Sequence, residues 1–121
     1  MPDAGFRPLS ILVVEDSEDL RELIVLWLTN EGHRVVWAAN VGEARSMIAL
    51  RGFPDVIATD YHLKDGNGFD MVRGFRRLKP GLPALIFSGD LPDLLLEPGM
   101  EILQKPFNQN QLQEKLYRVC G

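Results

Sequence analysis

The amino-acid sequence predicts a three-layer α/β protein in which a five-stranded parallel sheet lies between helices. Short, continuous apolar runs alternate along the chain with segments in which apolar residues recur every three or four positions. The runs are typical of strands buried on both faces, and the spaced segments are typical of amphipathic helices. Strands that alternate with helices favour a parallel sheet, and right-handed crossovers make it doubly wound, with helices on both faces. The 121 residues suit a single domain, 1–121, with a core from about 9 to 119.

The first half of the chain contains two clear strand–helix units. Residues 9–14, LSILVV, form a continuous apolar run, and Ser17 is an N-cap candidate for the helix that follows. One stripe of that helix is apolar: Leu20, Leu23, Ile24, Trp27 and Leu28. Residues 34–39, RVVWAA, predict the second strand. Asn40 with Glu43 resembles a capping box and predicts the start of the second helix.

The second half of the chain continues the same alternation. Three more strands are expected at 55–59, 84–88 and 101–104. The helix after the third strand should turn Val72 and Phe75 inward. The segment between Pro92 and Pro98 has room for only a turn or two of helix. Asn108 repeats the capping signature and predicts the start of the last helix.

Composition narrows the class of protein. The formal net charge of −4 argues against nucleic-acid binding, which favours a basic surface. No apolar run approaches the roughly 20 residues that a membrane span needs, and the first residues lack the pattern of a signal peptide. A single cysteine, Cys120, fits a reducing compartment. We therefore expect a cytoplasmic protein without a membrane span.

Ionisable or hydroxyl side chains follow four of the five expected strands: Glu15 and Asp16, then Asp60, Ser88 and Lys105. The carboxyl ends of parallel strands meet at one edge of the sheet, where ligands bind. Three carboxylates held close together repel one another, and a hard divalent cation relieves that repulsion. Oxygen-only ligands favour Mg²⁺, which completes its octahedron with waters and phosphate oxygens.

The same group of residues suits phosphoryl transfer. A lysine and a hydroxyl at the edge can stabilise the charge of a transferring phosphoryl group. A carboxylate can also act as the nucleophile and become an aspartyl phosphate. The sequence therefore predicts a metal-dependent phosphoryl site at the carboxyl edge of the sheet.

Four motifs, VVED, TDYHL, FSGD and QKPF, stand in order at spacings that resemble the receiver domain of two-component response regulators. The resemblance to these chemotaxis-regulator-like domains covers residues 9 to 119. It implies a flavodoxin-like (βα)5 sandwich with strand order 2-1-3-4-5. It also implies a phosphoprotein of a phosphorelay, a regulatory domain that catalyses only its own phosphorylation and dephosphorylation.

Position by position, the resemblance implies that Asp60 is the phosphoacceptor and that Ser88 and Lys105 contact the phosphoryl group. The implied metal ligands are Asp16, Asp60, Glu15 through a bound water, and the backbone carbonyl of His62. The metal would be Mg²⁺, with Mn²⁺ as a possible substitute. The peptide bond between Lys105 and Pro106 is usually cis in the family.

The resemblance also implies partners. A sensor histidine kinase or a phosphotransfer protein would supply the phosphoryl group, and a downstream protein would bind the face formed by the fourth helix, the fifth strand and the fifth helix. The short segment between Ser88 and Lys105, with its LQKPF motif, is similar to receivers joined to hybrid sensor kinases. Ile102 stands where the family commonly has a tyrosine or phenylalanine that swings inward on activation.

Three other functions remain open on the sequence. A flavin carrier on the same fold needs a phosphate-binding loop after the first strand, where this chain has carboxylates. A metal-dependent phosphatase working through Asp60 often has a second acid two residues later, where this chain has His62. A degenerate receiver would act as a docking module without phosphorylation. Ile102 favours this last reading mildly, and the complete set of site residues opposes it.

Overall fold

The computed structural model describes residues 7–90 and 92–121. Its main sheet has five parallel strands: β1 (Ser10–Val14), β2 (Arg34–Ala38), β3 (Val56–Asp60), β6 (Ala84–Ser88) and β7 (Met100–Gln104). Four helices are described: α1 (Glu18–Asn30), α2 (Val41–Arg51), α3 (Gly68–Leu78) and α4 (Gln109–Cys120). The spatial strand order is β2-β1-β3-β6-β7. This order equals 2-1-3-4-5 once the small hairpin β4 (His62–Leu63) and β5 (Gly66–Asn67) is set aside, so the expected fold class is confirmed.

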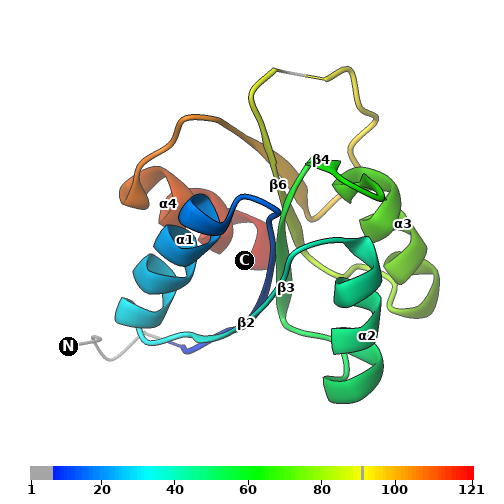
Figure 1. Ribbon diagram of the computed structural model, residues 1–121, viewed down its shortest axis with the longest axis horizontal. Helices are drawn as coiled ribbons and strands as arrows, with labels where there is room; N and C mark the ends of the chain where they lie inside the picture. The colour runs from blue at the N-terminus through cyan, green and yellow to red at the C-terminus, as the bar shows by residue number, and fades with distance from the viewer. Residues whose placement is uncertain (1–6, 91) are drawn as a thin grey trace.

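The helices cover the sheet in two pairs, with α1 and α4 on one face and α2 and α3 on the other (Figure 1). Alternate residues of the inner strands belong to two separate cores. Leu12, Ile57 and Ile86 pack towards α2 and α3, whereas Val13 and Phe87 pack towards α1 and α4. Both faces of the central strands are therefore buried, which explains their continuous apolar runs.

Side-chain caps fix where the helices begin. Ser17, Asn40 and Asn108 each accept a hydrogen bond from a backbone amide of the first turn, at the three positions that the sequence predicts. Asn67 does the same for α3. These caps satisfy amides that have no partner within the helix. The caps at Ser17 and Asn40 therefore fix the starts of α1 and α2 close to the carboxyl ends of β1 and β2.

The prediction of a short helix between Pro92 and Pro98 is wrong. Residues 92–97, which the structure describes, form no helix. The amide of Leu94 bonds to the carbonyl of Pro92, and the amide of Leu96 bonds to that of Leu94. Hydrogen bonds between residues two apart are those of tight turns and not of a helix. The five residues between these prolines are too few to recover the cost of helix nucleation.

The carboxyl ends of the strands are tied together beyond the regular sheet. The amide of Glu15 donates to the carbonyl of Ala38, and the amide of Lys105 donates to the carbonyl of Ser88 at 2.7 Å. The predicted site residues therefore extend from a rigid backbone ladder. Within the described part of the chain, none of the helices has the length and apolar character that crossing a membrane requires.

Candidate functional site

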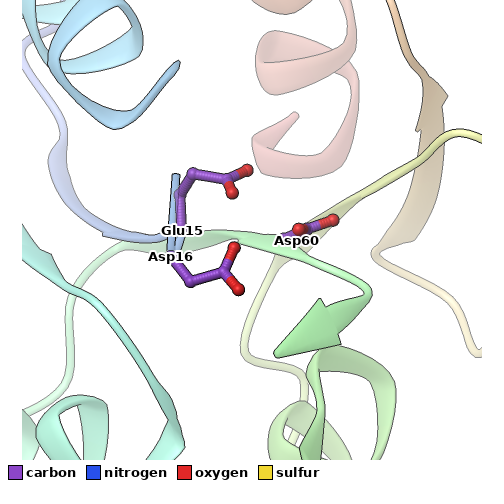
Figure 2. Close-up of side chains that lie close together, drawn as sticks. All are labelled: Glu15, Asp16 and Asp60. Atoms are coloured by element: carbon purple, nitrogen blue, oxygen red, sulfur yellow. The ribbon is translucent and has the colours of Figure 1, made fainter. Parts of the chain in front are cut away.

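Three carboxylates meet at the carboxyl edge of the sheet. Glu15 and Asp16 follow β1, and Asp60 ends the neighbouring strand β3. One oxygen from each side chain lies within 4.8 Å of the others. Figure 2 shows the carboxylates of Glu15 and Asp16 extending from the end of β1 on the side of Asp60. These oxygens are close enough together for one cation to be shared by the three acids, directly or through a bound water.

Glu15 is the most deeply buried of the three acids. Its side chain is 1% exposed, and its Oε2 accepts a hydrogen bond from the amide of Ser17 at 3.1 Å. Burial, with a smaller contribution from the nearby Asp60, raises the pKa of Glu15 to about 7, although Ser17 and Lys105 act in the opposite direction. Near neutral pH Glu15 is therefore only partly ionised, and a nearby cation would favour its charged form.

Lys105 supplies one positive charge to this cluster. Its Nζ lies 3.2 Å from Oδ1 of Asp60 and 3.3 Å from Oε1 of Glu15. Burial alone would lower the pKa of Lys105, but Glu15 and Asp60 raise it above its usual value. The ammonium group is therefore held charged between the two carboxylates. The peptide bond from Lys105 to Pro106 is cis, as the resemblance implies.

Ser88 is fully buried at the end of β6, next to β3. Its hydroxyl donates a hydrogen bond to Oδ1 of Asp90 at 2.8 Å, and this bond lowers the pKa of Asp90. Nε2 of His62 lies 3.9 Å from the same Asp90 oxygen. His62 and Asp90 are both exposed, so the histidine side chain lies at the rim and outside the cluster of three carboxylates.

The backbone around Asp60 is packed closely. The amide of Tyr61 donates to the carbonyl of Phe87, and the amide of Gly68 donates to the carbonyl of Tyr61, each at 2.8 Å. A Cβ on Gly68 would overlap the carbonyl oxygen of Asp60 and would lie 2.8 Å from Cγ2 of Thr59. The start of α3 therefore lies directly against the end of β3, and only glycine fits there.

The structure brings together most of the residues that the sequence singles out. The three acids and Lys105 form one cluster, and Ser88 ends the adjacent strand. Sequence reasoning missed the second layer of contacts, including the Arg21 guanidinium, which donates to the backbone carbonyl of Glu15 at 3.1 Å. The helical spacing of α1 placed Arg21 near the strand end, but nothing in the sequence identified its partner.

The fold and the site define a doubly wound α/β domain with an acidic pocket at the carboxyl edge of its sheet. The model of the response regulator receiver domain family matches residues 11–117, and the chain belongs to this family. Receiver domains are regulatory phosphoacceptor domains of two-component signalling. They accept phosphoryl groups from histidine kinases and bind Mg²⁺ at such an acidic pocket.

Similar proteins include both kinases and regulators. The chain is 33% identical to the sensor histidine kinase AruS of Pseudomonas aeruginosa, over 98% of this chain and 13% of that protein. It is 32% identical to the probable transcriptional regulatory protein TcrX of Mycobacterium tuberculosis, over 89% of this chain and 48% of that protein. The chain thus spans half or less of these curated relatives.

Among solved structures, the receiver domain of the hybrid histidine kinase CckA superposes with a TM-score of 0.77 at 25% identity. The match covers 92% of this chain and 98% of that one. The similarity extends over nearly the whole sheet and its helices.

Proposed function

We propose that Asp60 accepts a phosphoryl group from the phosphohistidine of a sensor kinase or a phosphotransfer protein, and that the product changes a protein-binding surface. One observation carries this proposal: Asp60 lies at the centre of the site, within reach of Glu15, Asp16 and Lys105 together. An aspartate in such surroundings can act as a nucleophile, because positive charge near its attacking oxygen also stabilises the phosphoryl oxygens.

The donor set fits Mg²⁺. The three side chains offer oxygen ligands alone, and a cation beside Glu15 would offset the burial that raises the pKa of this acid. Asp16 and Asp60 would hold the ion directly, Glu15 would act through a water, and the backbone carbonyl of His62 would add a ligand. When bound, Mg²⁺ neutralises charge on the phosphoryl oxygens. Mn²⁺ suits the same oxygen ligands and would substitute for it.

The other side chains of the site have separate tasks in this proposal. Lys105 already lies 3.2 Å from Asp60 and would neutralise a phosphoryl oxygen beside it. Ser88 would turn its hydroxyl from Asp90 to the phosphoryl group. Loss of the hydrogen bond between Ser88 and Asp90 would then change the conformation of the segment between β6 and β7. The conformational change would therefore begin without an aromatic side chain at position 102, where this chain has Ile102.

The downstream surface belongs to the same proposal. It would comprise β7, α4 and the segment 92–97, which stands in place of the fourth helix expected there. Leu95 is 89% exposed in this segment. The similarity to the sensor histidine kinase AruS and to the receiver domain of the hybrid histidine kinase CckA supports the proposal that the chain acts as the receiver of a hybrid kinase.

Incubation with acetyl phosphate and Mg²⁺, followed by intact mass measurement, tests the phosphoacceptor role. The wild type should gain about one phosphoryl group, as a single activated carboxylate requires. Asp60→Asn should gain none, and the control Asp70→Asn, at an exposed acid in α3, should behave as the wild type. An unmodified wild type would favour a docking module that works without phosphorylation. Steady hydrolysis of an added phosphomonoester would favour a phosphatase.

A further inference from the structure

The residues that follow Asp60 form a small hairpin whose tip is attached to a different part of the fold. Strands β4 and β5 pair His62 with Asn67 and Leu63 with Gly66, so Lys64 and Asp65 form the turn. The base of the hairpin is closed by the hydrogen bond from Gly68 to Tyr61. The position of the hairpin sets where the backbone of His62 lies relative to Asp60.

The carboxylate of Asp65 holds the hairpin tip to the start of α2. Its Oδ1 accepts the amide of Val41 at 2.9 Å, and its Oδ2 accepts the amide of Gly42 at 3.0 Å. These two amides have no partners within the helix. Both bonds are charge-assisted, and the negative charge lies at the positive end of the helix dipole. These hydrogen bonds lower the pKa of Asp65, so its carboxylate is ionised near neutral pH.

Packing does little to hold the turn itself. Leu63 is buried in the core beneath the hairpin, but Lys64 and Asp65 are exposed. A hollow of about 150 Å³ lies between the hairpin and α2, with Arg45 and Asp70 among its lining residues. Because this space is open, the hydrogen bonds of Asp65 determine how far the tip stands from α2.

We infer that Asp65 is a positioning residue for the metal site, because it holds the hairpin that carries the His62 backbone carbonyl in a fixed place beside Asp60. This inference rests on the proposed function, in which that carbonyl is a metal ligand. A ligand that is fixed before the ion arrives binds it more tightly than a mobile one. Asp65 thus acts through the hairpin and does not contact the ion.

Metal binding without phosphorylation gives the direct test. Free Mn²⁺ is measured by electron paramagnetic resonance while the wild type, Asp65→Ala and Asn40→Ala are titrated. Loss of a partner that orients a metal ligand weakens binding by about tenfold or more, so Asp65→Ala should raise the Kd for Mn²⁺ by about this factor. Asn40→Ala removes the other side-chain cap of α2, which accepts the amide of Glu43, without touching the hairpin. Its Kd should stay within about twofold of the wild type.

A second variant keeps the test decisive if Asp65→Ala does not fold. Asp65→Asn retains one acceptor oxygen, and we expect a rise in Kd of about threefold. Equal Kd values for Asp65→Asn and the wild type would overturn the inference. So would equal losses in Asp65→Ala and Asn40→Ala, because the start of α2 would then matter and the hairpin would not.

Phosphorylation kinetics separate this inference from the proposed function. With acetyl phosphate, Asp65→Ala should react slowly at low Mg²⁺ and approach the wild-type rate when Mg²⁺ is saturating. A wild type that is never phosphorylated refutes the proposed function, whatever the Mn²⁺ titrations show. A wild type that reacts normally, with Asp65→Ala indistinguishable from it at every Mg²⁺ concentration, refutes the positioning role alone.

Discussion

The ammonium group of Lys105 lies 3.2 Å from Oδ1 of Asp60, although Lys105 follows β7, Asp60 ends β3, and β6 lies between these two strands. The lysine side chain therefore reaches across the end of a strand to the proposed phosphoacceptor. Because the amide of Lys105 is also bonded to the carbonyl of Ser88, the base of this side chain is fixed to β6. The charge of Lys105 is thus held at the place where a phosphoryl group would be attached.

Replacing Lys105 should slow phosphorylation more than it affects folding. Removal of one group that stabilises a developing negative charge lowers a rate by about a hundredfold, and we expect Lys105→Ala to lose about this factor with acetyl phosphate. The measurement is the time course of intact mass at fixed Mg²⁺. Lys115→Ala is the matched control, because Lys115 pairs with Glu101 on the surface at 3.0 Å. Similar rates for both variants would contradict the role of Lys105.

Mg²⁺ binding should weaken as the pH falls below 7. In the folded protein without metal, Glu15 releases its proton near pH 7, since burial raises its pKa from 4.5 to about 7. If the ion requires this acid to be ionised, the Kd rises by about tenfold for each pH unit below that value. Calorimetric titrations from pH 5.5 to 8.5 should show the trend, and Glu15→Gln should abolish it. A wild-type Kd that is constant over this range would contradict the prediction.

The same raised pKa affects stability in the metal-free protein. A carboxyl group that binds its proton more tightly when folded stabilises the fold fully below its unfolded pKa of 4.5, and this contribution is lost as the pH rises through about 7. The unfolding free energy of Glu15→Gln, relative to the wild type, should therefore increase between pH 5 and pH 8. Urea unfolding in the presence of a chelator measures this difference.

The lifetime of the phosphorylated protein should depend on two residues at the rim. Nε2 of His62 lies 3.9 Å from Oδ1 of Asp90, and both side chains are exposed. They lie where water would reach a phosphoryl group on Asp60. Substituting either residue should change the dephosphorylation rate, which is followed as loss of the phosphoryl mass after the donor is removed. Asp93→Asn, at an exposed acid farther along the same segment, serves as the control. Unchanged lifetimes in both His62→Ala and Asp90→Ala would refute this prediction.

Two glycines of α3 should respond in opposite ways to alanine. Gly68→Ala places a methyl group against the carbonyl oxygen of Asp60, and such overpacking destabilises by about 1–3 kcal/mol. Gly74 has open space around its added Cβ, so Gly74→Ala should stabilise the helix by about 1 kcal/mol. Urea unfolding of both variants measures these changes. A neutral Gly68→Ala would contradict the close contact with Asp60, and a destabilised Gly74→Ala would contradict the open space around Gly74.

The sheet and the meeting of the acids were predictable because they depend on local patterns. The apolar runs identify buried strands, and parallel strands necessarily place Glu15, Asp16 and Asp60 at one edge. The strand order itself came from the family resemblance and not from these patterns. The caps at Ser17 and Asn40 were also readable, because the residue that caps a helix is close in sequence to the amides that it satisfies.

Features that depend on contacts between distant segments were not predictable in this way. Asp65 looks like an ordinary turn residue, and its two partners in α2 lie more than twenty positions earlier in the chain. The turns between Pro92 and Pro98 replaced an expected helix because that segment is too short to offset the cost of starting one. The partners of Asp65 and the turns at 92–97 both depend on the three-dimensional structure, which the local sequence pattern does not specify.

The shared lysine determines the charge balance of the pocket. With all groups ionised, three carboxylates and one ammonium group leave two negative charges, which a divalent cation compensates in full. A phosphoryl group would then bring excess anionic charge into a neutral enclosure. Lys105 would be drawn away from Glu15 towards the new oxygens, and the buried glutamate would lose its counterion. Signalling in this protein would then begin as a redistribution of one cation between two anions, before any helix moves.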